Sequence, residues 1–173
     1  MGRVRCNALT VRLPGNAERC NGDIAVVLAS VDAPAAAVTA ADLQDILETT
    51  PFTAAYGFKL GRFSRNCCEI LVPYIALFER PGGIVSGQAY MTAADVAAWF
   101  AIKTVSGAAD RSVTIEMTTS FLDSLQRGDF VCRAEVMKAG KTATFITAQC
   151  STTDGRILTH HTIRYLRPVT FQP

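Results

Sequence analysis

The middle of the chain carries its most apolar stretch, between the turn at Arg80–Gly83 and Lys103. Within it the single charged side chain is Asp95. Helix-forming residues, alanine above all, fill the positions from about Gly87 to Ile102, and Ser86 stands directly before them as the N-cap candidate. A helix that is apolar on nearly all sides has to be enclosed by other elements. The pattern therefore predicts a long central helix wrapped by a sheet.

Four runs typical of strands follow this helix, at 112–122, 129–138, 142–152 and 156–166. The first run alternates, and its period of two predicts one face formed by Val113, Ile115, Met117, Thr119 and Phe121. The sequences QRGD, KAGK and TTDG join the runs and carry the Gly and Asp residues that tight turns favour. We therefore predict an antiparallel meander of these four strands.

The segment before the central helix adds extended structure over residues 58–80 and a helix at 40–49. Thr39 and Asp42 have the spacing of a capping box, and Leu43, Ile46 and Leu47 share one helix face. The fold class is thus α+β, one long helix and a curved antiparallel sheet of five to six strands. Residues 1–30 show no periodic pattern of apolar and polar residues, and the segment that begins at Val31 resembles the natural beginning of the chain. We predict a single domain over 39–173, preceded by an arm at 1–38 that is either disordered or an over-long start.

Composition narrows the function classes. The net charge is +2 and the basic residues form no cluster with aromatic residues, so no nucleic-acid partner is expected. No uncharged apolar run reaches the roughly 18 residues of a membrane-spanning helix, so no membrane partner is expected. The six cysteines include no C-x-x-C pair, and the two histidines, His160 and His161, adjoin each other. We therefore expect no metal site and reduced, buried thiols in a cytoplasmic protein.

The sequences RPGGIVSGQAYMTAADVAAWFAI, SVTIEMTTSFL and RGDFVCRAEVMKAGKTATFITAQCSTTDGRILTHHTIRYL together resemble the PaaI-like acyl-CoA thioesterases of the hot-dog fold. The resemblance covers roughly residues 51–168. A glycine opens the helix, an aspartate stands eight residues later, and an AGK turn closes the last hairpins. One position departs from the family pattern: His-Gly-Gly at the helix start is here Ser86, Gly87 and Gln88.

The resemblance implies hydrolysis of acyl-CoA thioesters without a cofactor, since coenzyme A belongs to the substrate. A carboxylate has to activate water or attack the carbonyl itself, and Asp95 is the candidate for either role. The backbone N–H of Gly87, at the helix N-terminus, is the candidate oxyanion donor.

Four further residues are candidates for binding the substrate. Ser86 and Gln88 flank Gly87, and Gln88 is suited to binding the thioester oxygen. Thr92 lies one turn before Asp95 and is suited to holding its carboxylate by a hydrogen bond. Lys141 in the AGK turn is a candidate for binding the phosphates of coenzyme A. For Trp99, one turn after Asp95, packing is the favoured role.

Geometry adds a requirement for two subunits. Gly87 and Asp95 lie about 12 Å apart along one helix, so they cannot both contact one carbonyl group. Two antiparallel helices related by a twofold axis bring Gly87 of one subunit to Asp95 of the other. We therefore expect a homodimer or a dimer of dimers.

One alternative function is an acyl-CoA-binding module without turnover, favoured by the absent histidine at position 86. A hot-dog dehydratase ranks last, since no histidine lies on or near the helix.

Overall fold

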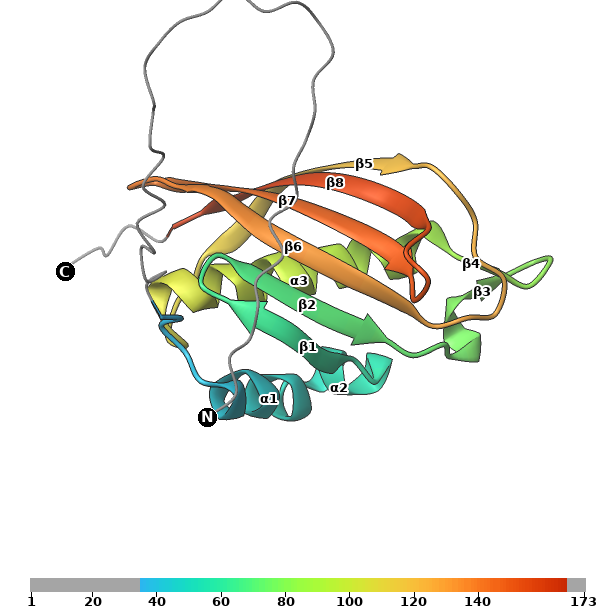
Figure 1. The fold of residues 1–173 in the computed structure, drawn as a ribbon, viewed down its shortest axis with the longest axis horizontal. Coiled ribbons are helices and arrows are strands. Elements are labelled where there is room, and N and C mark those ends of the chain that lie inside the picture. The colour runs from blue at the N-terminus through green and yellow to red at the C-terminus, as the bar shows by residue number, and fades with distance from the viewer. Residues whose placement is uncertain (1–34, 168–173) are drawn as a thin grey trace, which may run out of the picture. The chain divides into compact units, whose positions relative to one another are not determined.

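The computed structural model describes residues 35–167, which form one long helix lying across a six-stranded antiparallel sheet (Figure 1). The helix, α3, spans Gly87–Ser106. The strand order in the sheet is β1-β2-β6-β7-β8-β5. The strands are β1 (Lys59–Ser64), β2 (Cys67–Val72), β5 (Val113–Phe121), β6 (Phe130–Ala139), β7 (Ala143–Thr152) and β8 (Ile157–Leu166). The predicted fold class and the central helix are confirmed.

Burial of α3 explains why its sequence is so poor in charge. Alanines at 93, 94, 97, 98 and 101 are almost inaccessible to solvent, and so are Phe100 and Ile102. Small side chains let the backbone of α3 approach β2, β6 and β7 closely, while Phe100 and Ile102 fill the space between the helix and these strands. Each large side chain buried in this way contributes roughly 1.5–3 kcal/mol.

The sheet differs from the predicted meander in the place of β5. Strands β6, β7 and β8 form consecutive hairpins, but β5 pairs with β8 and lies at the edge of the sheet. The segment from Leu122 to Asp129 is too long for a tight hairpin turn and carries the chain past β8 and β7 to β6, in the interior of the sheet. Turn residues mark where a chain reverses, but they do not determine which strands pair.

A β-bulge in β5 also corrects the predicted face of that strand. The register shifts between Thr114, opposite Tyr165, and Glu116, opposite Arg164. Ile115 is the extra residue, and it changes the phase of the alternation. As a result Thr114 shares the face of Met117, while Val113 and Ile115 are exposed.

Two short helices precede the sheet. Helix α1 (Ala40–Thr49) begins with the predicted capping box, in which the Thr39 and Asp42 side chains each accept a hydrogen bond from the other's backbone N–H. Its residues Leu43 and Leu47 are buried, and α2 (Pro51–Tyr56) follows directly. A 3₁₀ turn, η1 (Ala76–Phe78), and the two-residue strands β3 (Glu79–Arg80) and β4 (Ile84–Val85) lead from β2 into α3.

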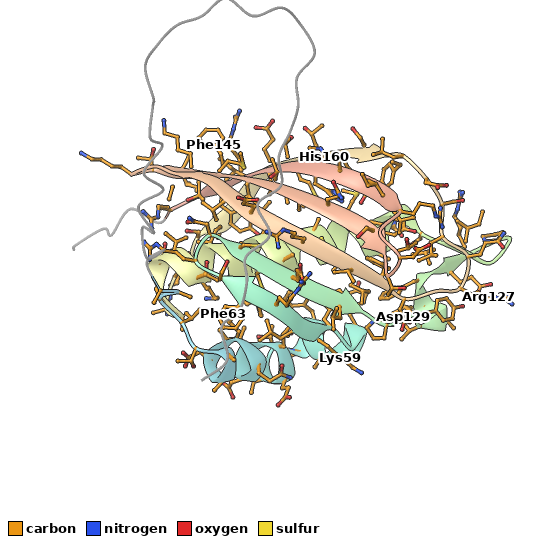
Figure 2. All side chains as sticks on the ribbon, in the orientation of Figure 1. Lys59, Phe63, Arg127, Asp129, Phe145 and His160 are labelled. Atoms are coloured by element: carbon orange, nitrogen blue, oxygen red, sulfur yellow. The ribbon has the colours of Figure 1, made fainter. Side chains whose placement is uncertain are left out.

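The two histidines lie on opposite faces of β8, as predicted. His160 is exposed on the outer face of the sheet with Phe145 (Figure 2). His161 is buried under α3, and its ring nitrogens lie 2.9 Å from the Thr119 hydroxyl and 2.7 Å from the Thr159 hydroxyl. Among residues 35–167, no helix is long and apolar enough to cross a membrane, and no His, Cys, Asp and Glu side chains gather in a group that could hold a metal.

Cysteines 67, 68, 132 and 150 are free and buried. Cys6, Cys20 and the predicted arm up to position 34 lie outside the described residues. The last residues of the predicted arm already pack on the domain. The Ala37 N–H donates to the Thr104 carbonyl at 2.8 Å, and Val38 is buried.

We expect a chain starting at Val31 to keep its stability, whereas one starting at Pro51 should lose it. The second truncation removes α1, and each buried leucine lost from a core costs about 2–5 kcal/mol. Urea denaturation followed by circular dichroism measures the unfolding free energy of both truncated chains. A marked loss of unfolding free energy in the chain starting at Val31 would show that residues 1–30 pack on the domain.

Candidate functional site

The N-terminus of α3 is fixed by the short hairpin that precedes it. The Ser86 N–H donates to the Phe78 carbonyl at 2.7 Å, and the Val85 N–H donates to the Leu125 carbonyl at 2.9 Å. Ser86 is the N-cap, as predicted, but its hydroxyl makes no capping hydrogen bond. The N–H groups of Gly87 and Gln88 donate to no oxygen of the described residues. They are therefore available to an external acceptor, at the positive end of the helix dipole.

Gly87 opens into a cavity of about 440 Å³. Its wall contains the apolar residues Ile84, Val85, Phe121 and Leu122, together with Arg80 and Tyr90. The ring of Phe121, from the end of β5, lies against Gly87 so closely that a Cβ there would stand 2.9 Å from two ring atoms. A side chain at this position would therefore have to displace the exposed ring of Phe121.

Asp95 lines a second cavity, of about 220 Å³. The Thr114 hydroxyl donates to Asp95 Oδ1 at 2.6 Å, and the Tyr165 hydroxyl donates to the same oxygen at 2.7 Å. Thr114 and Tyr165 are cross-strand partners on β5 and β8, so both side chains project from one point of the sheet toward α3. Asp95 Oδ2 accepts no hydrogen bond from residues 35–167.

Burial and the neighbouring Asp95 carboxylate raise the pKa of Tyr165 above its usual range. The phenol therefore stays protonated at neutral pH and remains a donor. The arrangement holds one carboxylate oxygen of this cavity-lining residue in place and leaves the other without a partner among the described residues. A carboxylate oriented in this way can accept a proton from water or attack an electrophilic carbon.

Each of the two cavities also contains a buried hydroxyl without a partner. Among the described residues, Tyr90 Oη and Ser112 Oγ are the two buried side-chain polar atoms that make no hydrogen bond. Tyr90 lines the Gly87 cavity and Ser112 lines the Asp95 cavity. Buried polar groups in native proteins are nearly always hydrogen-bonded, so an external group or water is expected at both hydroxyls.

The other predicted residues take different places. Thr92 does not hold Asp95: its hydroxyl donates to the Gln88 carbonyl at 2.9 Å, the usual back-bond of a helical threonine. Gln88 is exposed beside Gly87. Trp99 packs on Phe100 and beneath the Lys103 ammonium, as expected, and also lines the Asp95 cavity. Lys141 is exposed in the β6–β7 turn and lines neither cavity.

Sequence reasoning did not find Thr114 or Tyr165 as partners of Asp95. Both belong to strands that pair only through the non-local β5–β8 register. The bulge at Ile115 also turns Thr114 toward the helix, against the strict alternation. A tyrosine among the inward positions of the last strand is the one signal available in the sequence.

The Gly87 and Asp95 cavities share no lining residue. Both residues lie on α3, eight positions apart, which corresponds to about 12 Å along the helix axis. A single chain therefore presents two separate half-sites, one with backbone donors and one with a carboxylate.

Comparison with known proteins identifies the family. Residues 82–159 match the sequence profile of the thioesterase superfamily. A Saccharolobus solfataricus protein that is provisionally named an esterase is 31% identical over 99 residues, which cover 57% of this chain and 70% of that protein.

Solved structures share the fold. The Escherichia coli PaaI protein, from the phenylacetic acid degradation operon, is 15% identical with a TM-score of 0.68, covering 75% of this chain and 92% of that one. A thioesterase family protein from Silicibacter pomeroyi is 24% identical with a TM-score of 0.68, covering 74% of this chain and 96% of that one. A thioesterase from Haemophilus influenzae is 13% identical with a TM-score of 0.70, covering 78% of this chain and 94% of that one. These likenesses identify the hot-dog fold.

We predict that Asp95 and Tyr165 are energetically coupled. In a double-mutant cycle with Asp95→Ala and Tyr165→Phe, the free energies of unfolding should be non-additive by about 0.5–3 kcal/mol, because each change removes the same hydrogen bond. Tyr56→Phe is the matched control, since Tyr56 stacks on Phe58 and Phe78 and does not line this cavity. Additivity of Asp95→Ala with Tyr165→Phe, as with Tyr56→Phe, would contradict the contact.

Proposed function

Because this chain belongs to the thioesterase superfamily, and to its PaaI-like, hot-dog-fold members, we propose that it hydrolyses acyl-CoA thioesters to the free acid and coenzyme A. The observation that carries the proposal is the Asp95 carboxylate, which lines a cavity and is anchored through one oxygen by Thr114 and Tyr165, while the other oxygen has no partner among the described residues. Thioester hydrolysis requires a general base or a nucleophile held in such an orientation.

In the general-base route, Asp95 removes a proton from water while the water oxygen attacks the thioester carbon. The negative charge that develops on the carbonyl oxygen is stabilised by the Gly87 N–H, aided by the dipole of α3. The C–S bond then breaks, and the proton held by Asp95 passes to the departing thiolate. In the nucleophilic route, Asp95 attacks the thioester carbon, and the C–S bond breaks to release the coenzyme A thiolate and leave an anhydride between Asp95 and the acyl group. Water then hydrolyses the anhydride to the free acid and the Asp95 carboxylate, and one of the protons released passes to the thiolate. Both routes need the same two groups on opposite sides of the thioester carbon.

The site requires two subunits in this proposal. Strand β5 lies at the edge of the sheet and exposes Val113 and Ile115 at one end and Phe121 and Leu122 at the other. Val113 lines the Asp95 cavity, while Phe121 and Leu122 line the Gly87 cavity. Antiparallel pairing of two β5 strands about a twofold axis near Met117 would bury these side chains. It would also place the Gly87 cavity of one subunit beside the Asp95 cavity of its partner. A homodimer, or a dimer of such dimers, is the assembly we propose.

Substrate binding involves the surfaces beside these two groups. Ser86 and Gln88 flank the oxyanion donor, and Thr92 lies between Gly87 and Asp95 on α3. Exposed Lys141, in the β6–β7 turn, is the residue we assign to the phosphates of coenzyme A.

The competing function is an acyl-CoA-binding module without turnover, favoured by Ser86 in place of the family's histidine. Release of free thiol from a panel of acyl-CoA esters separates the two functions.

Asp95→Asn should lower kcat by roughly 10²–10⁴-fold with little change in KM, because the amide can neither accept the proton nor attack. Asp45→Asn is the matched control: Asp45 is an exposed aspartate on α1 that lines neither cavity, so this variant should keep full activity. Thiol release gives the rates, and circular dichroism checks the fold. The mechanism is wrong if the parent is active and Asp95→Asn retains more than about half its rate.

A further inference from the structure

Tyr90, one of the residues that line the Gly87 cavity, has a buried hydroxyl that pairs with no described residue. Tyr90 is 2% exposed and its hydroxyl makes no hydrogen bond among residues 35–167. Tyr90 lies three residues after Gly87 on α3, and positions three apart on a helix lie on neighbouring parts of one face. The same cavity is therefore lined by the free N–H of Gly87 and by the phenol of Tyr90.

The ring of Tyr90 is held in place. It packs against Phe130 with the ring centroids 4.9 Å apart, and the residue as a whole is 2% exposed. Burial raises the pKa of Tyr90 to about 12, and the Leu125 backbone offsets part of the rise. The hydroxyl is therefore protonated at neutral pH and is offered as a fixed donor.

The rest of the wall contrasts with this donor. Ile84, Val85, Phe121 and Leu122 are apolar. Asp123, also in the wall, is engaged by a salt bridge to Arg156. Arg80 stands exposed at the cavity and forms no salt bridge within the described part of the chain. The Tyr90 hydroxyl is already buried without a partner, so a plain alkyl chain would leave it unpaired, whereas an oxygen atom that reaches it would supply the missing hydrogen bond.

We propose that the Gly87 cavity binds the acyl group and that Tyr90 donates a hydrogen bond to an oxygen on that acyl chain, beyond the thioester carbonyl. This inference rests on the proposed thioesterase function and specifies its substrate class: oxygenated acyl groups, carrying a keto or hydroxyl function, in preference to unsubstituted alkyl groups. Tyr90 is then a specificity-determining residue. Sites built to hydrogen-bond a substrate oxygen reject the analogue that lacks it, because the protein group is left unpaired.

The test compares hexanoyl-CoA with its 3-hydroxy, 4-oxo and 5-oxo derivatives, which differ little in size but place the oxygen at successive distances from the thioester. For the parent protein, at least one oxygenated ester should have a kcat/KM roughly tenfold or more above that of hexanoyl-CoA. Tyr90→Phe should abolish this ratio without lowering the rate for hexanoyl-CoA. Tyr56→Phe, which also removes one phenol but outside the cavity, should keep the ratio.

A binding measurement separates this inference from the proposed function. Non-hydrolysable thioether analogues of the same four compounds are titrated into the intact protein by calorimetry. Tighter binding of an oxygenated analogue, lost in Tyr90→Phe, supports the inference even if no ester is hydrolysed, in which case the hydrolytic function fails alone. Equal binding of all four by the parent overturns the inference even if all esters are hydrolysed, and the hydroxyl then holds water instead. Absence of both binding and turnover overturns both proposals.

Discussion

Enclosure of α3 by the sheet is the constraint on which the rest of the structure depends. Buried alanines at positions 93, 94, 97, 98 and 101 of the helix let β2, β6 and β7 approach closely. This packing determines where the free N–H groups at Gly87 and the carboxylate at Asp95 lie, since both are on the same rigid element. Chemistry placed on a buried helix is held more precisely than chemistry placed on a loop.

A second consequence is the separation of the two groups. A helix rises about 1.5 Å per residue, so eight residues put the oxyanion donor and the carboxylate too far apart for one small carbonyl group. Each instead lines its own cavity, with its own unpaired buried hydroxyl, Tyr90 at one and Ser112 at the other. The exposed apolar ends of β5 adjoin these same cavities. The half-sites and the proposed subunit interface thus occupy one continuous edge of the domain.

Local pattern predicted much of this architecture. The Thr39 capping box, the start of α3 at Gly87 and the opposite orientations of His160 and His161 all follow from spacing within a few residues, and the structure confirms them. The pairing of β5 with β8 could not be predicted in this way, because it joins segments about 45 residues apart and a bulge changes its register. The anchoring of Asp95 by Thr114 and Tyr165 depends on that pairing, so it was missed and Thr92 was assigned in its place.

The central claim is that Gly87 of one subunit and Asp95 of its partner form one active site. Its most direct test mixes two inactive variants, Asp95→Asn and Gly87→Val, unfolding and refolding them together so that subunits exchange. Hybrid dimers then contain one site with both groups intact, and random pairing should restore about a quarter of the parent's thiol-release activity. Each variant refolded alone should stay inactive, with light scattering confirming dimers in all samples. If hybrids form and the mixture remains inactive, the two groups do not act across a subunit boundary.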